Sequence, residues 1–263
     1  TQAFKAFYGD RFFYILYFPK DVPEADPLSI PSWRNAFLDR GGNGFFTFRN
    51  QYRDSTDMMS QIYLKLRGNK GHNGPDALSF RILGLNTAWA VGGGRYGLKL
   101  NGQDAYVRSM NTVYPVNPDS LLSINGNAGR IIGTPEIKAD GSGHVVSSIA
   151  RNNVGTNSHK RWFLADYSRK AGVEAVYVIA DNSTDGLFWQ MCTLERYAVA
   201  TSGNTFTIPG RGGATMRGTV LYPSQPVFTT GTRIRGSDFT GTITGGNRYV
   251  HFKGDGDYLV VLT

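Results

Sequence analysis

Alternation of apolar and polar residues is the clearest pattern in the chain. In residues 46–49 two phenylalanines alternate with Thr and Arg, and in residues 62–67 Ile, Leu and Leu alternate with Tyr63, Lys65 and Arg67. A period of two places successive side chains on opposite faces of a strand, so the pattern predicts half-buried β-strands. Similar runs recur at residues 76–85, 159–167, 175–181, 213–222, 248–252 and 257–263.

Turn-forming residues separate these runs, for example Asp140-Gly141 and Asp185-Gly186. The 33 glycines and 11 prolines interrupt the 263-residue chain about every six residues, which leaves little room for long helices. The sequence therefore excludes a helical bundle and predicts an all-β fold. We expect a large antiparallel β-sandwich of two stacked sheets, similar to a jelly roll.

The first residues have a different pattern. Phe4, Phe7 and Tyr8 lie at helical spacing, and a segment with four prolines follows them. Such a proline-rich segment crosses a surface in extended form rather than packing into a core. The sequence thus predicts a short helical segment with a linker at residues 1–32, followed by the sandwich domain at residues 33–263.

The net charge narrows the choice of partner. The 28 Lys and Arg residues exceed the 20 Asp and Glu residues by eight, which favours nucleic acid, anionic lipid or acidic polysaccharide. No phosphate-binding or RNA-binding motif is present, so nucleic acid is not an expected partner. The apolar run at residues 12–18 is far shorter than the roughly 20 residues that span a bilayer, so no membrane span is expected. The single Cys192 lies in an apolar stretch, which predicts a buried, inert thiol.

The densest polar cluster is the glycine-rich turn at residues 68–80, which contains His72 and Asp76. Loops held by a rigid sheet are common places for functional groups. An ordinary hairpin, in which Asp76 caps backbone amides and His72 is solvated, explains the same residues.

The residues around this turn resemble a known family. The stretches GFFTFRN and QIYLKLRGNKGHNGPDALSFRILGLNTAWAVGGGRYG are similar to the central-to-C-terminal β-sandwich of heparinase II/III-like polysaccharide lyases. In that family a strand ending in Phe-Arg precedes a glycine-rich H-x-H-x-D-x-x-x-F turn and then a strand that closes in D-x-G. The resemblance covers roughly residues 44–97, and more weakly residues 159–181 and 213–223.

The resemblance implies a function and a location. It implies cleavage of a uronic-acid-containing acidic polysaccharide by β-elimination, with His72 as the catalytic residue in the cleft. The opening residues resemble the end of the helical toroid that precedes the sandwich in such lyases. An upstream toroid, as a domain or a separate chain, is then the partner that supplies most of the remaining catalytic groups. A periplasmic or extracellular location follows from the resemblance as well.

The family's structural zinc site departs from its pattern here. Asp76 matches the motif aspartate, but the second motif histidine falls on Gly74 and the later aspartate ligand falls on Gly92. His159 matches the remaining ligand histidine, although an ordinary histidine at a strand end explains it equally well. Zinc needs three or four N, O or S ligands, so we expect no metal and no other cofactor.

Basic and aromatic residues coincide at several positions. Sugars stack on aromatic faces, and anionic sugars pair with arginine, so such positions are candidates for substrate binding. The candidates are Asn73, Arg95, Tyr96, Arg108, Lys160 and Arg161. Ordinary alternation, with aromatic side chains inward and cations in water, is the simpler explanation.

Two functions remain open from the sequence. The first is the β-sandwich portion of a polysaccharide lyase, active only when joined to an upstream helical domain. The second is a noncatalytic carbohydrate-binding or surface structural module with the same fold, which the losses at Gly74 and Gly92 favour.

Overall fold

The computed structural model confirms an all-β fold. It describes residues 23, 29, 36–38, 44–66, 76–92, 98–100, 103–104, 110–120, 129–151, 157–184, 186–235 and 246–263. Strands dominate these ranges, with short 3-10 turns at η4 (Pro118–Ser120) and η5 (Arg211–Gly213). The N-terminal helix and the boundary near residue 32 lie outside the described residues and stay predictions.

The strands form three antiparallel sheets. The five-stranded sheet follows the chain order and contains β1 (Ala36–Leu38), β2 (Phe45–Arg49), β3 (Met59–Tyr63), β4 (Ser79–Gly84) and β5 (Thr87–Ala90). The six-stranded sheet has the order β7 (Gln103–Asp104), β6 (Leu98–Leu100), β17 (Phe228–Arg235), β18 (Gly246–Lys253), β13 (Phe188–Leu194) and β8 (Val113–Tyr114). The eight-stranded sheet has the order β14 (Ala200–Ser202), β15 (Thr205–Pro209), β16 (Thr215–Tyr222), β19 (Asp257–Leu262), β12 (Val176–Ser183), β11 (Asn157–Asp166), β10 (Gly143–Arg151) and β9 (Gly129–Ile137).

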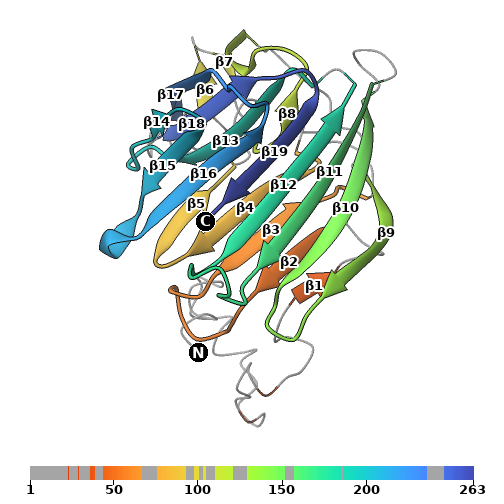
Figure 1. The fold of residues 1–263 in the computed structure, drawn as a ribbon, viewed down its shortest axis with the longest axis vertical. Coiled ribbons are helices and arrows are strands. Elements are labelled where there is room, and N and C mark those ends of the chain that lie inside the picture. The colour runs from red at the N-terminus through yellow and green to blue at the C-terminus, as the bar shows by residue number, and fades with distance from the viewer. Residues whose placement is uncertain are drawn as a thin grey trace, which may run out of the picture.

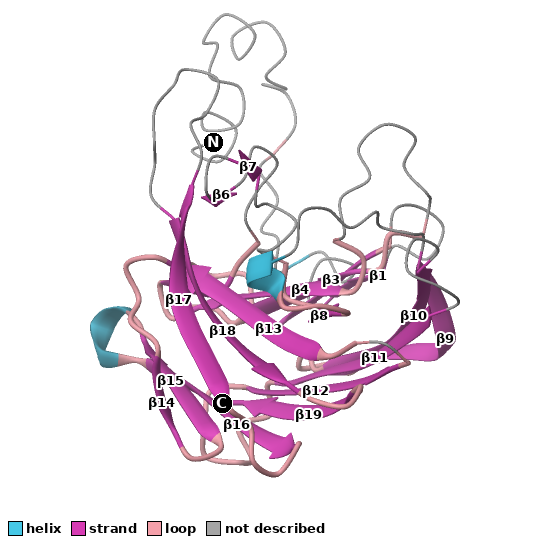
Figure 2. Cartoon of the chain, turned by 90° about the horizontal axis from the view of Figure 1, so that it is seen from above, coloured by secondary structure: helices cyan, strands magenta, loops and turns pink. Residues whose placement is uncertain are grey.

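The eight-stranded sheet forms one layer, and the other two sheets together form the second layer (Figure 1 and Figure 2). The amide of Val91, just after β5, donates to the carbonyl of Cys192 on β13 at 2.9 Å. The hydroxyl of Thr193 donates to the carbonyl of Ala88 on β5 at 3.3 Å. These bonds join the five- and six-stranded sheets edge to edge, and Cys192 at this seam is buried, as predicted.

Aromatic side chains fill the space between the layers. The ring of Phe163 on β11 has centroid distances of 6.2 Å to Phe48 and 5.9 Å to Phe80, which lie on the opposite layer. The indole of Trp189 on β13 lies 5.4 Å from the ring of Phe252 on β18. These rings are all fully buried. Burial of such large rings contributes most of the hydrophobic stabilisation of this core.

Alternation identifies six of the described strands after residue 75, misses others such as β9, β10 and β13, and fails at one end of β3. The six runs predicted after residue 75 coincide with β4, β11, β12, β16, β18 and β19. The expected strand through residue 67 instead ends at Tyr63. Lys65 then has a φ of 53° and its side chain is fully buried, so its place on a polar strand face is wrong. Within the described ranges no helix has the length and apolar character needed to cross a bilayer.

Candidate functional site

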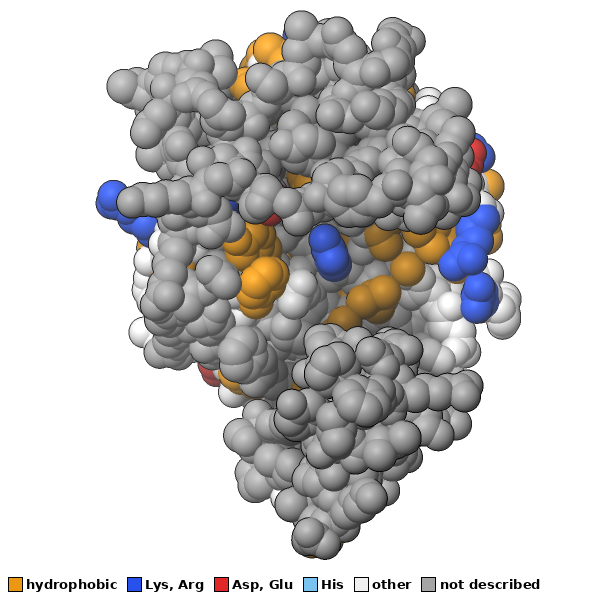
Figure 3. All heavy atoms as spheres, turned by 180° about the vertical axis from the view of Figure 1, so that it is seen from behind, with side chains coloured by type: hydrophobic (Ala, Val, Ile, Leu, Met, Phe, Trp, Pro, Cys, Tyr) orange, Lys and Arg blue, Asp and Glu red, His pale blue; other side chains and the backbone are white. Residues whose placement is uncertain are grey.

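The outer face of the five-stranded sheet carries aromatic and polar side chains in rows across the strands. Thr47, Gln61 and Arg81 are cross-strand neighbours, and the amide of Gln61 donates to the hydroxyl of Thr47 at 3.3 Å. Next to this row the rings of Phe45 and Tyr63 stack with centroids 4.4 Å apart. Figure 3 views this side of the molecule, where basic and apolar side chains lie close together. An exposed guanidinium beside aromatic rings suits an anionic sugar.

The described ends of three strands meet at one end of this sheet. Residues 67–75 follow the end of β3 and precede β4, and residues 93–97 follow the end of β5. Because these strands are antiparallel, the end of β3, the start of β4 and the end of β5 meet at the same end of the sheet. The candidates on these segments, and the one after β7, lie outside the described residues: His72, Asn73, Arg95, Tyr96 and Arg108.

The base of the segment at residues 67–75 is held by described residues on both sides. The ammonium of Lys65 lies 3.0 Å from a carboxylate oxygen of Asp76. The amide of Leu78 donates to the carbonyl of Tyr63 at 2.7 Å. Lys65 and Leu78 both have left-handed backbone conformations, with φ of 53° and 64°, which cost bulky residues free energy and cluster at functional sites. Asp76 thus forms an ion pair with Lys65. The ordinary hairpin, in which Asp76 only caps backbone amides, does not include this contact.

A buried ionic cluster lies beneath this base. The guanidinium of Arg161 on β11 contacts both carboxylate oxygens of Asp181 on β12, with nitrogen–oxygen distances of 2.6 and 2.9 Å. His159 contacts the same carboxylate through Nε2 at 2.7 Å. Arg161 also donates to the carbonyl oxygens of Leu78 and Asn111. All three charged or polar side chains are fully buried, so the cluster links the eight-stranded sheet to Leu78 and Asn111 from inside the sandwich.

The charge of Arg161 controls the ionisation of Asp181. Burial raises the pKa of the Asp181 carboxyl, but the neighbouring charges of Arg161 and His159 and their hydrogen bonds outweigh burial and lower the pKa to about 2. The folded-state pKa lies below the ordinary value of 3.8, so the ionised carboxylate stabilises the folded protein. The stability is fully present above about pH 5 and is lost as the pH falls through about 2.

This linkage gives a measurable acid dependence. We expect the free energy of unfolding to fall by about 2 kcal/mol through this one group between about pH 5 and pH 2, because one pKa unit corresponds to about 1.4 kcal/mol. Denaturant titrations at several pH values measure the fall. The Asp181→Asn variant starts from lower stability and should show a flatter acid dependence. An equally steep decline in that variant would assign the acid sensitivity to other carboxyls.

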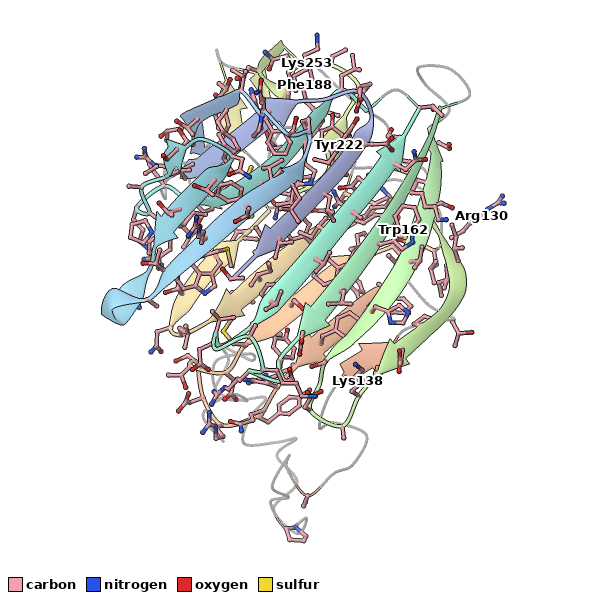
Figure 4. All side chains as sticks on the ribbon, viewed as in Figure 1. Arg130, Lys138, Trp162, Phe188, Tyr222 and Lys253 are labelled. Carbon is pink, nitrogen blue, oxygen red and sulfur yellow. The ribbon has the colours of Figure 1, made fainter. Side chains whose placement is uncertain are left out.

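On β11 the directions of the side chains are the reverse of ordinary alternation, in which aromatic side chains face inward and cations face water. The residues concerned are Lys160, Arg161 and Trp162. Arg161 points into the core, whereas Trp162 is 38% exposed on the outer face of the eight-stranded sheet (Figure 4). The ammonium of Lys160 lies 4.2 Å from the centre of the Trp162 ring, a cation–π contact. Arg161 faces inward because Asp181 compensates its charge there. Neither Lys160 nor Arg161 therefore lies on the outer face of the five-stranded sheet.

The described residues do not fit the family's zinc ion. His159 is bonded to Asp181, and Gly92 offers no donor side chain. Within the described ranges no three His, Cys, Asp or Glu side chains lie close enough to hold a metal. Gly74 lies outside these ranges.

Several residues of this region were not predicted from the sequence. Asp181 had a usable signal, because it has the same parity along β12 as the core residues Tyr177 and Ile179. Asn111 had none. Its side chain donates to the carbonyl of Phe80 at 2.6 Å and accepts from the amide of Cys192 at 2.7 Å, contacts between segments far apart in sequence.

Comparisons with known proteins show a likeness at the level of structure. No family model and no curated protein sequence matches the chain. Among solved structures, a heparinase III gene product matches with a TM-score of 0.65 and 14% identity, over 99% of this chain and 40% of that chain. Heparan sulfate lyase HepC from Pedobacter heparinus matches with a TM-score of 0.65 and 12% identity, also over 99% of this chain and 40% of that chain. The chain therefore shares its β-sandwich fold with heparinase structures, as the sequence resemblance implied, and spans about 40% of their length.

Proposed function

We propose that this chain is the β-sandwich portion of a polysaccharide lyase that cleaves a uronic-acid-containing polysaccharide by β-elimination. The observation that carries the proposal is the outer face of the five-stranded sheet. It combines the exposed Arg81, the amide of Gln61 and the stacked Phe45–Tyr63 pair with the strand ends that bound residues 67–75. The fold shared with heparan sulfate lyase HepC supports an acidic glycan as the substrate.

The proposed reaction needs three chemical functions. A cation or hydrogen-bond donor neutralises the uronate carboxylate, a base takes the C5 proton, and an acid protonates the glycosidic oxygen as its bond to C4 breaks. The electron pair of the C5–H bond forms the new C4–C5 double bond. We assign the first or second function to His72, because the ordinary pKa of an imidazole lies near neutrality. Asn73, Arg95, Tyr96 and Arg108 are the proposed sugar-binding residues.

The remaining functions require a partner. We infer that an upstream helical domain or chain covers the outer face of the five-stranded sheet and contributes the rest of the catalytic groups. The matched structures are longer than this chain, which supports a further part. A periplasmic or extracellular location belongs to this proposal, since acidic polysaccharides are found there.

An absorbance assay tests the proposal. β-Elimination yields a 4,5-unsaturated uronate that absorbs in the ultraviolet, so we expect rising absorbance when the complete polypeptide is incubated with heparan sulfate. Alginate, hyaluronan and ulvan form a comparison panel. A flat signal across the panel, together with measurable glycan binding, would replace the lyase with the noncatalytic carbohydrate-binding module. The glycine at position 92, where the family has a metal ligand, favours that second function.

A further inference from the structure

A pocket of about 360 Å³, lined by both charged and apolar side chains, lies at the other end of the five-stranded sheet's outer face. Met59, Leu83 and Ala88 from three adjacent strands contribute to its lining. The turns around it contribute polar groups from segments far apart in the chain. These groups are Arg49, Asp54, Ser55, Asp57, Asn86, Thr87, Arg196 and Arg211.

The acidic groups of this pocket are already bound within the protein. The buried carboxylate of Asp57 contacts Arg53 at 3.2 Å and Arg49 at 3.5 Å. Asp54 accepts hydrogen bonds from the amide and the hydroxyl of Thr56 at 2.8 and 2.6 Å. These bonds lower the pKa of the Asp54 carboxyl from its ordinary value. The positive charge of Arg49 is likewise shared with Asp57.

Two further guanidinium groups line the pocket without such a partner. Arg196 and Arg211 are exposed, and across the described residues no ion pair joins either of them to a carboxylate. Arg196 lies 5.2 Å from the centre of the Tyr197 ring. Three guanidiniums and two carboxylates line the pocket, so its lining has a net charge of +1.

The backbone at Arg211 is fixed against the β4–β5 turn. Its amide donates to the hydroxyl of Thr87 at 2.9 Å, and the preceding Gly210 lies so close to the indole of Trp89 that a Cβ would clash with it. In the β4–β5 turn itself, the amide of Leu85 donates to the carbonyl of Thr56 at 3.1 Å, and the amide of Asn86 donates to the carbonyl of Ser55 at 2.8 Å. Both acceptors belong to the turn between β2 and β3. Two guanidiniums that form no ion pair among the described residues, one of them on backbone held by the bond to Thr87, suit an oxyanion such as sulfate or carboxylate.

We propose that this pocket is a remote anion subsite for an acidic polysaccharide that lies along the outer face of the five-stranded sheet. Tyr63, at the end of β3 that bounds residues 67–75, is four residues from Met59 in the pocket, a separation of about 14 Å along the strand. The pocket would thus hold a sulfate or carboxylate several sugar units away from the bond that is cleaved. This inference rests on the proposed function for the identity of the glycan.

Binding measurements on a matched pair of variants test the subsite. The test variant is Arg196→Gln/Arg211→Gln in the complete polypeptide, and the probes are a heparan sulfate octasaccharide, its desulfated counterpart and a disaccharide. The control variant is Arg130→Gln/Arg217→Gln, which removes the same charge from exposed positions on the opposite layer. Isothermal titration calorimetry gives each dissociation constant, and thermal melting checks the fold of each variant.

We expect the dissociation constant of the octasaccharide to rise about tenfold for each guanidinium removed in the test variant, because a hydrogen bond to a charged group contributes that much. The disaccharide and the control variant should show little change. A loss confined to the sulfated octasaccharide identifies sulfate as the bound group, and an equal loss with the desulfated one identifies carboxylate. Equal weakening in the control variant, or none in the test variant, overturns the subsite. Lyase activity is read separately, so selective loss of binding without any unsaturated product would overturn the proposed function alone.

Discussion

Replacing Asp181 with alanine should lower the free energy of unfolding by about 3–5 kcal/mol, because it leaves the buried guanidinium of Arg161 without its counter-charge. A domain of this kind has a total stability of about 5–15 kcal/mol, so the loss is a large fraction of the whole. Denaturant titration followed by tryptophan fluorescence measures it. The exposed pair of Arg169 and Glu174 is the matched control, and Glu174→Ala should cost less than about 1 kcal/mol.

A double variant separates the charge from the hydrogen bonds. Arg161→Met/Asp181→Leu removes both members of the buried ion pair and should recover most of the stability lost in the single variant. The recovery should be incomplete, because the carbonyl oxygens of Leu78 and Asn111 lose the guanidinium that donates to them. If Asp181→Ala proves no more damaging than Glu174→Ala, the buried cluster contributes nothing particular to the fold.

Replacing His72 with alanine should reduce kcat by about 10²–10⁴-fold, the usual contribution of a positioned acid–base group. The assay is the formation of unsaturated uronate by the complete polypeptide, with glycan affinity measured in parallel. His144→Ala is the control, because His144 is a solvent-accessible histidine on β10 that pairs with Glu136 at 3.5 Å. Its removal should leave both activity and binding unchanged.

The outcome for His72 also separates the two proposed functions. Loss of activity with retained binding supports a chemical role for the imidazole. An active His72→Ala variant would transfer the catalytic role to the upstream partner and leave this chain with substrate binding alone. Equal losses in the His72 and His144 variants would indicate a general effect on folding, which thermal melting detects.

The sequence predicted the sandwich because its strands have simple alternation. In β2 the apolar Phe46 and Phe48 alternate with Thr47 and Arg49, and the structure buries both phenylalanines. β12 and β19 also alternate in burial, although their sequences are mostly apolar. The pattern fails where a polar residue is inside. Arg161 looks like a surface cation, since nothing within its own strand reveals that Asp181 of the neighbouring strand lies opposite it. Pairing across strands decides such positions, and a single strand does not contain that information.

The candidate site was harder to predict than the fold for the same reason. In the pocket at the far end of the five-stranded sheet, for example, Arg196 and Arg211 follow different strands. They line the same pocket as Arg49 only because turns of both layers converge there. The loop base depends on the left-handed conformations of Lys65 and Leu78, which residue type does not favour. The glycine-rich stretch at residues 68–80 is recognisable from its composition. The ion pair of Asp76 with Lys65 is not, because the residues next to Asp76 in the sequence do not indicate it.

The anchored ends of the segment at residues 67–75 make it a natural position for redesign. The backbone carbonyl of Lys65 accepts a hydrogen bond from the amide of Gly129. The amide of Leu78 donates to the carbonyl of Tyr63, and the carbonyl of Leu78 accepts from Arg161, so described residues hold both flanks of the segment. Loop length adds little to the cost of closure when the ends are already in place. We therefore expect the scaffold to keep its melting temperature when segments of different length and charge are grafted at this position.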